Sequence, residues 1–157
     1  MDLAVTPAGG TARTIACLAH TPALVEPFLG WAAALHLEGC LSRRHHEILA
    51  LRAAHNCGSD YEWVEHLGWA RRAGLDAQDI EAVTRGDGPS DPIEATLVRA
   101  ADELAVDHSM TAATRQVLLE ALGPQGVVEV AMVVGQYTML SMLANVVAAP
   151  VPGGDQQ

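Results

Sequence analysis

The chain contains no lysine, because all nine of its Lys and Arg residues are arginine. Schiff-base catalysis and the attachment of pyridoxal phosphate both require a lysine amine, so both chemistries are excluded. A phosphate-binding loop that depends on lysine is excluded as well. Nineteen acidic residues give a formal net charge of −10, and no stripe of basic residues exists. We therefore expect neither nucleic acid nor a membrane as a partner.

Cysteine is also scarce, with three residues and no C-x-x-C pair: Cys17, Cys40 and Cys57. This odd, unpaired set is typical of a reduced, cytoplasmic chain, and we expect the three side chains to be small hydrophobic residues of the core. The first ten residues, MDLAVTPAGG, lack the basic segment that begins a signal peptide. The sequence therefore predicts a cytoplasmic protein.

Aromatic residues are few, and no alternating strand pattern is present. Half of the 157 residues are hydrophobic, mainly alanine, leucine and valine, which favours packed helices. We predict one all-α domain of six to eight helices over residues 1–149, followed by a flexible tail at 150–157. The most apolar stretch, residues 126–149, contains Glu129 and Gln136 among other polar residues. It is interpreted as a buried or interface helix rather than a membrane span.

Helix start and stop signals divide the chain into segments. Asp91, Pro92 and Glu94 show this most clearly, as an N-cap, a first-turn proline and the acid of a capping box. The predicted helices, given by the residues that mark their ends, run from Thr21 to Gly39, Ser42 to Cys57, Ser59 to Gly74, Asp76 to Gly86, Asp91 to Val106, Thr111 to Gly123, and over residues 125–148.

The stretch NCGSDYEWVEH, residues 56–66, begins the third of these helices. Glu62 and His66 are four residues apart in it and therefore share a helix face. On the preceding helix, Glu47 lies among apolar residues at helical spacing, where a buried carboxylate needs a partner. The turn at Gly58 folds the two helices back on each other, so Glu47 and His66 can meet. Such a pair can transfer protons, because the carboxylate holds one ring nitrogen and leaves the other free for a substrate.

These residues also have structural interpretations. Ser59 and Glu62 form the S-x-x-E pattern of a capping box, which alone can explain both. His66 can be a hydrogen-bonded core histidine, and Tyr61 and Trp63 can be packing residues. Glu62, His66 and a histidine of the neighbouring helix could bind a metal, but no H-E-x-x-H or Cys/His pattern supports this, and no metal is predicted. Three further histidines are assigned to helix surfaces: His45, His46 and His55.

The segment LSRRHHEILALRAAHNCGSDYEWVEHLGWARRAGLDAQDIEAV, residues 41–83, resembles the carboxymuconolactone decarboxylase family of the AhpD-like superfamily. The resemblance covers nearly the whole chain and implies an AhpD-like helical domain with a central helix hairpin. The alkylhydroperoxidase branch of this superfamily carries a C-x-x-C pair, whose positions fall here on Ser59 and Glu62 when His66 is matched. Peroxide reduction needs a nucleophilic and a resolving thiol, so the chain is not expected to be a peroxidase, nor Cys57 to be catalytic.

The decarboxylase branch has the motif Y-E-x-x-x-H, which Tyr61, Glu62 and His66 match. The resemblance implies a cofactor-free enzyme in which a conjugated carbonyl takes up the electrons as carbon dioxide leaves, and an acid protonates a distant carbon. It implies that His66 is the proton donor and Glu47 its orienting partner, with Glu62 or Tyr61 as a second relay. The residues expected to bind the substrate are Arg52, for a carboxylate, and His55 and Tyr137.

The family does not determine the substrate, and three functions stay open. The first is cofactor-independent decarboxylation of a lactone or β-keto acid. The second is isomerisation, dehydration or cyclisation at the same site, for example in specialised metabolism. The third is a non-catalytic ligand-binding protein, which the retention of Glu47 and His66 disfavours. The last helix is apolar on most faces, and together with the resemblance this predicts a homotrimer or homohexamer.

Overall fold

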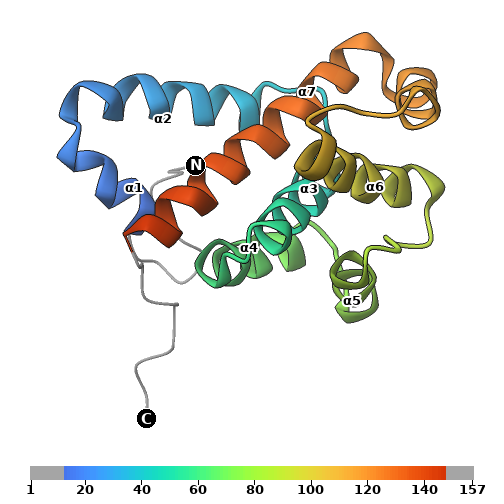
Figure 1. The fold of residues 1–157 in the computed structure, drawn as a ribbon, viewed down its shortest axis with the longest axis horizontal. Helices are drawn as coiled ribbons and strands as arrows, with labels where there is room; N and C mark the ends of the chain where they lie inside the picture. The colour runs from blue at the N-terminus through green and yellow to red at the C-terminus, as the bar shows by residue number, and fades with distance from the viewer. Residues whose placement is uncertain (1–12, 148–157) are drawn as a thin grey trace.

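The computed structural model describes residues 13–147, which form α-helices and one 3-10 helix and contain no strand (Figure 1). The prediction of an all-α chain with six to eight helices is confirmed for this range, and the arrangement agrees with an AhpD-like fold. The predicted tail at 150–157 and the segment MDLAVTPAGG lie outside the described residues. The elements are α1 (Arg13–Cys17), η1 (Leu18–His20), α2 (Pro22–Leu37), α3 (Arg43–Asn56), α4 (Asp60–Arg72), α5 (Ala77–Arg85), α6 (Pro92–Asp107) and α7 (Ala112–Val146).

Side-chain caps explain why the predicted helix boundaries agree closely with the structure. Ser42 accepts a hydrogen bond from the backbone N–H of His45 at 3.1 Å, and Thr111 accepts one from Thr114 at 3.2 Å. The helix end predicted at Gly123 is a kink inside α7, where this glycine has φ 70° and ψ 178° and a proline follows. Two helical segments of α7 therefore meet at the predicted boundary.

Helix α3 lies at the centre of the molecule and packs against α4, α6 and α7 (Figure 1). Because it is covered on several sides, residues 46–54 are all buried, and Ile48 and Leu49 are fully inaccessible. The turn to α4 passes through Gly58, whose φ of 58° favours glycine. The predicted central hairpin of α3 and α4 is confirmed.

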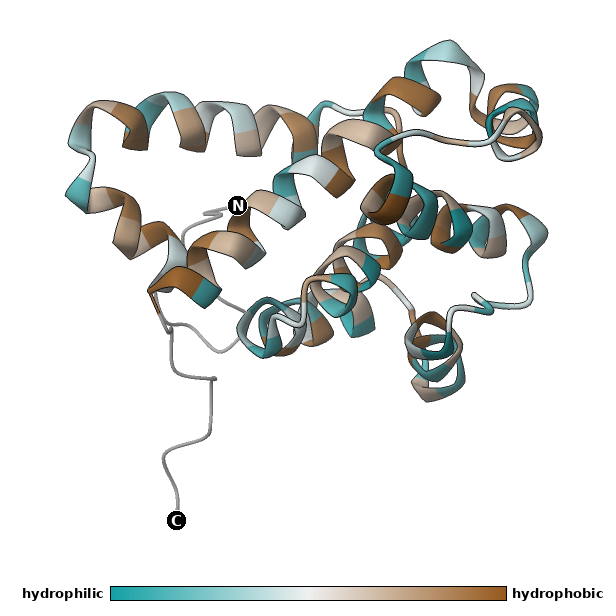
Figure 2. Ribbon diagram, viewed as in Figure 1, coloured by the Kyte–Doolittle hydropathy of each residue, from teal (hydrophilic) through white to brown (hydrophobic). Residues whose placement is uncertain are grey.

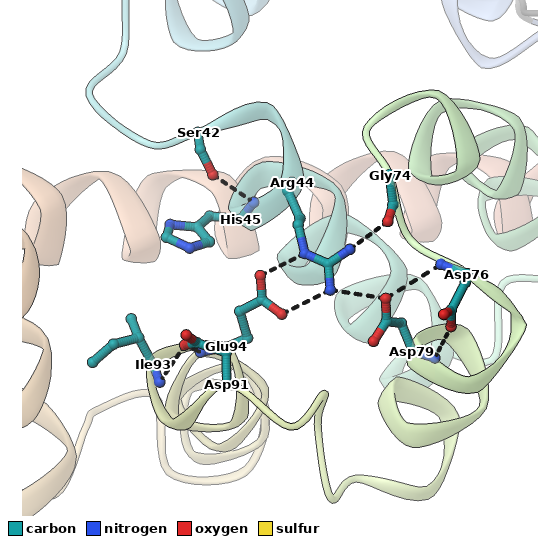
Figure 3. A network of polar contacts seen from close by, with 9 residues as sticks. All are labelled: Ser42, Arg44, His45, Gly74, Asp76, Asp79, Asp91, Ile93 and Glu94. Atoms are coloured by element: carbon teal, nitrogen blue, oxygen red, sulfur yellow. Dashed lines mark hydrogen bonds and ion pairs between the residues drawn. The ribbon is translucent and has the colours of Figure 1, made fainter.

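Arg44 ties the start of α3 to two other helices (Figure 3). Its guanidinium binds both carboxylate oxygens of Glu94 on α6, at 2.6 and 2.9 Å. It also donates to the Gly74 carbonyl at 2.6 Å and to Asp79 on α5 at 2.8 Å. The predicted capping-box role of Glu94 is wrong, because its carboxylate binds Arg44 and Asp91 alone caps α6. This bidentate, partly buried pair orients the α3–α4 hairpin against the rest of the fold.

Glu129 of α7 anchors the connection between α2 and α3. Its buried carboxylate accepts hydrogen bonds from the backbone N–H groups of Cys40 at 2.6 Å and Leu41 at 3.1 Å. The chain passes so close that a side chain at Gly39 would collide with this carboxylate. One polar residue of the apolar stretch 126–149 therefore has a structural role at the end of α2.

Helix α7 is the one helix in the described part of the chain that is long and apolar enough to cross a membrane. The core helix of a soluble protein passes the same test. Hydrophobic residues recur along its length (Figure 2), and its buried positions include Gln136 and Tyr137. Its exposed large hydrophobic residues are Val117, Leu119, Val128, Met132, Met139, Met142 and Val146.

The prediction that the cysteines belong to the core is wrong. Cys40 is exposed, and Cys17 and Cys57 are half-buried. The physical reason is their position, since Cys17 ends α1, Cys40 lies in the α2–α3 connection and Cys57 is the C-cap of α3. All three are free thiols.

Candidate active site

A cavity of about 80 Å³ lies between the N-terminal helices α1 and α2 and the helices α3, α4 and α7. In Figure 1, α1 and α2 form an arm along one side of α7. The hydrophobic lining residues are Ile15, Phe28, Leu29, Ala32, Trp69 and Leu140. The polar ones are Thr14, His36, Glu47, Glu62, Glu65, His66, Gln136 and Tyr137.

The predicted contact between Glu47 and His66 is confirmed. Glu47 Oε2 lies 2.8 Å from His66 Nδ1, across the α3–α4 hairpin. The carboxylate is 2% exposed and the imidazole 12%, so water has little access to the bond. This bond leaves Nε2 of His66 on the side of Glu62, whose Oε2 is 3.8 Å away and which also lines the cavity. The geometry suits an imidazole that exchanges a proton with a molecule in the cavity.

The charges around His66 decide its protonation. Burial has the largest single effect and disfavours the imidazolium, but the surrounding carboxylates, led by Glu47, together outweigh it and raise the pKa of His66 above its ordinary value of 6.5. Glu62 and Glu65 raise the pKa of His66 further by smaller amounts. At a given pH the imidazolium is therefore more populated than in an ordinary histidine, which suits His66 as a proton donor.

We expect NMR titration of the histidine ring resonances to give a pKa above 6.5 for His66. Glu47→Gln should lower that pKa, because it removes the largest stabilising charge. Since the folded-state pKa is raised, the stability contributed by the pair is fully present below pH 6.5. It should be lost as the pH rises through the folded-state pKa, as measured by denaturant unfolding.

The control for this titration is Glu81→Gln, which removes an exposed carboxylate that pairs with Arg85 on α5. This variant should leave the titration of His66 unchanged. A His66 pKa below 6.5 in the unmodified protein, or one that Glu47→Gln does not move, would show that the carboxylate does not control the imidazole.

Glu62 faces the cavity rather than its own helix end. Ser59 Oγ accepts a hydrogen bond from the Glu62 backbone N–H at 3.5 Å, so Ser59 is the predicted cap. The reciprocal bond of a capping box is absent from the contacts of the described residues, and Glu62 Oε1 is buried without a hydrogen-bond partner there. Burial raises the pKa of Glu62, against opposing effects of His66 and of a hydrogen bond with Thr14. Glu62 therefore lies beside His66 as a buried carboxyl group whose pKa is raised.

Tyr137 was predicted to bind the substrate, and the structure places it in the cavity wall. Its ring packs edge-on against His66, with 4.4 Å between centroids, and its hydroxyl lies 2.9 Å from His46 Nε2. Burial raises the pKa of Tyr137 well above its ordinary value, so the phenol stays protonated. Burial, together with the charges of His36, His66 and Arg43, lowers the pKa of His46 to about 3, so this imidazole stays neutral.

The assignment of His46 to the helix surface is wrong. Neighbouring helices cover the face of α3 that carries His46, and this residue is 2% exposed. His36 of α2 packs against it at 4.8 Å between ring centroids, and burial lowers the pKa of His36 as well. His45 is half-buried, and only His55 of the three is exposed.

Two site residues that were not predicted lie close to predicted ones in the sequence. Trp69 follows His66 by three positions and lines the cavity from the same face of α4. Gln136 precedes Tyr137 on α7. Helical spacing could have identified Trp69, whereas no local signal identifies His36.

Arg52 does not lie at the cavity, so its predicted role in binding a substrate carboxylate is wrong. Its guanidinium forms a bidentate ion pair with Asp102 on α6, at 2.5 and 3.0 Å. It also donates to the backbone carbonyls of Val83 and Thr84, both at 2.8 Å. These bonds connect α3, α5 and α6, and Arg52 is a structural residue.

His55 and Tyr61 also lie outside the cavity lining. His55 is exposed near the end of α3, with its ring 5.9 Å from that of Trp63. Tyr61 is buried in the core, 4% exposed, at the first turn of α4. The predicted roles of His55 in substrate binding and of Tyr61 as a relay therefore have no support in the positions of these side chains.

One group of described residues could hold a metal ion, namely His36, His46 and Glu47, whose ligand atoms lie within 4.8 Å of one another. It differs from the set weighed from the sequence, which contained Glu62 and His66. In this structure Glu47 binds His66 and His46 bonds to Tyr137. Glu47 and His46 are thus hydrogen-bonded to residues of the cavity wall, and His36 packs against the His46 ring.

Comparison with known proteins identifies the family of the chain. A sequence model described as the carboxymuconolactone decarboxylase family matches residues 22–103, which is just over half of the chain. The matched range contains Glu47, Glu62 and His66 and ends before the α7 residue Tyr137. A search of curated proteins finds no match to the chain.

Proposed function

The chain belongs to the carboxymuconolactone decarboxylase family, and on that premise we propose that it is an acid–base enzyme that moves a proton next to a substrate carbonyl, without a cofactor. The observation that carries the proposal is the 2.8 Å contact between buried Glu47 and His66 at the cavity wall. A ligand-binding protein would not require a proton carrier held in this way, so the non-catalytic alternative is less well supported.

In the proposed mechanism, Glu47 holds the Nδ1–H of the His66 imidazolium, and Nε2–H is donated to a carbon of the substrate. The carbon accepts the proton as the electrons of an enolate or dienolate return to it, and His66 becomes neutral. In the reverse sense, neutral His66 removes a proton next to the carbonyl. We propose that Glu62, whose Oε2 lies 3.8 Å from Nε2, carries the second proton when a reaction both removes one proton and adds another.

Two reactions use this step. Decarboxylation, the activity in the family name, breaks a carbon–carbon bond, and the bonding electrons enter a conjugated carbonyl while carbon dioxide leaves. It is helped by a cation that binds the carboxylate, but Arg52 lies elsewhere and no arginine with a described side chain lines the cavity. This observation favours the second candidate, isomerisation, dehydration or cyclisation without loss of carbon.

The test is to incubate the protein in heavy water with an unsaturated lactone acid, a β-keto acid and an uncharged unsaturated lactone. Carbon dioxide release and deuterium incorporation are followed together by NMR. Release of carbon dioxide faster than in buffer supports decarboxylation, whereas rearrangement or deuterium incorporation alone supports the second candidate. An absence of both with all three compounds would contradict the acid–base proposal.

A thiol peroxidase activity is not proposed. Cys57 is half-buried at the C-cap of α3 and does not line the cavity. Its nearest cysteine in the sequence, Cys40, lies in the connection between α2 and α3. These positions give no support for a pair of thiols at the site.

We also propose that the protein is a cytoplasmic homotrimer or homohexamer. Seven large hydrophobic side chains of α7 are more than one-third exposed, which is typical of a surface covered in an assembly. Light scattering should give a mass three or six times the chain mass of 16.5 kDa. A monomeric mass would contradict this proposal.

A further inference from the structure

Two buried acceptor atoms in the cavity wall lack a hydrogen-bond partner among the described residues: Glu62 Oε1 and Gln136 Oε1. Only one other such side-chain atom exists in the described chain, on Ser141. Leaving a buried polar atom unsatisfied is destabilising, and native proteins satisfy most such atoms. Two unsatisfied acceptors in one cavity therefore point to a molecule that binds there and supplies a hydrogen-bond donor.

Gln136 precedes Tyr137 on α7, and both residues line the cavity. The amide oxygen of Gln136 is the buried atom that has no hydrogen-bond partner among the described residues. Because an amide oxygen accepts hydrogen bonds, a donor group on a bound molecule can satisfy it.

The charge of the cavity limits which molecules fit it. Three carboxylates line it, from Glu47, Glu62 and Glu65, and only the first is paired at hydrogen-bond distance with His66. None of the eight arginines with described side chains lines the cavity. A second anion in this space would face these carboxylates, and no arginine whose side chain the structure describes lines the space.

We infer that the substrate is an uncharged carbonyl compound bearing a hydroxyl group, which donates to Gln136 Oε1 and contacts Glu62 while the reacting carbon faces His66. This rests on the proposed function, since it takes His66 as the group that meets the reacting carbon. A hydroxyl suits Glu62 in either protonation state, because it both donates and accepts hydrogen bonds. The hydrophobic walls, including Phe28 and Leu140, suit the carbon skeleton.

The test uses three cyclopentanones that differ in one ring substituent: hydroxymethyl, methyl or carboxylate. Their affinities for the purified protein are measured by NMR titration. The hydroxymethyl compound should bind about 2- to 10-fold more tightly than the methyl compound, the value of one hydrogen bond. It should also bind more tightly than the carboxylate compound, since carboxylates line the cavity.

Gln136→Met removes the acceptor with little change in side-chain volume, so it should abolish the advantage of the hydroxymethyl compound and leave binding of the methyl compound. Gln116→Met is the matched control, because Gln116 is an exposed residue of the same helix. This control should keep the advantage. Circular dichroism should show unchanged helix content in both variants.

Equal binding of the hydroxymethyl and methyl compounds, tightest binding of the carboxylate compound, or no binding of any of the three overturns the inference. Exchange of the ketone α-protons with heavy water, compared between the unmodified protein and His66→Ala, separates this result from the proposed function. If exchange depends on His66 without a hydroxyl preference, the inference fails and the acid–base function stands. If the hydroxymethyl compound binds more tightly but no exchange occurs, the inference stands and the acid–base function fails.

Discussion

His66→Ala is expected to slow the chemical step by about 10²–10⁴-fold, the usual contribution of a positioned general acid or base. The imidazole is held by Glu47 at 2.8 Å and its other nitrogen lies 3.8 Å from Glu62, so its loss removes the group through which both carboxylates are proposed to act. The rate is measured as single-turnover conversion or deuterium incorporation, which separates chemistry from binding.

The control for this substitution is His55→Ala. His55 belongs to α3, is exposed, and lies outside the cavity lining, so its loss should leave the rate unchanged. Both variants should retain their helix content by circular dichroism. If His66→Ala keeps full turnover while folded, His66 is a structural histidine and the proposed mechanism is wrong.

Glu47→Gln is expected to reduce turnover by roughly 10- to 1,000-fold at neutral pH, because a nearby opposite charge shifts a pKa by about 1–3 units. The substitution keeps the side-chain shape but removes the charge that raises the pKa of His66. Less of the imidazolium then exists at neutral pH. For a step that needs the imidazolium, the loss of turnover should become smaller as the pH falls below the His66 pKa of the variant. At such a pH His66 is protonated in both proteins.

A pH–rate profile checks this prediction, with Glu81→Gln as the matched control on an exposed carboxylate. The double variant with His66→Ala should be no slower than His66→Ala alone, because Glu47 is proposed to act through the imidazole. If the losses of the two single variants add up in the double variant, Glu47 has a separate role. If Glu47→Gln alone leaves the rate unchanged, Glu47 has no part in the mechanism.

The helices of this protein could be predicted because their boundaries depend on local chemistry. Ser42, Ser59 and Asp91 accept hydrogen bonds from backbone N–H groups within three residues of themselves. The contact between Glu47 and His66 was also predictable, although they are 19 residues apart. A single short turn at Gly58 joins the two helices, so helical spacing alone determines which faces meet.

The roles of Arg52 and His46 depended on helices that are distant in the sequence. Whether Arg52 meets a substrate or Asp102 depends on where α6 packs, 50 residues later. Whether His46 is exposed depends on its contacts with His36 and Tyr137, from α2 and α7. The amino acid pattern of α3 is compatible with either outcome, since it specifies faces and not the neighbours that cover them.

The sequence by itself therefore determined the all-α class, most helix ends and the pairing of Glu47 with His66. It also excluded the chemistries that require a lysine. Only the tertiary structure decided that the cavity is enclosed by α1, α2 and α7, that Tyr137 meets His66, and that Gln136 presents an acceptor. The physical reason is how far apart in the sequence the interacting residues lie. Caps and helical periodicity act over a few residues, whereas the cavity arises where side chains from five helices pack together, and each of these contacts depends on all the others.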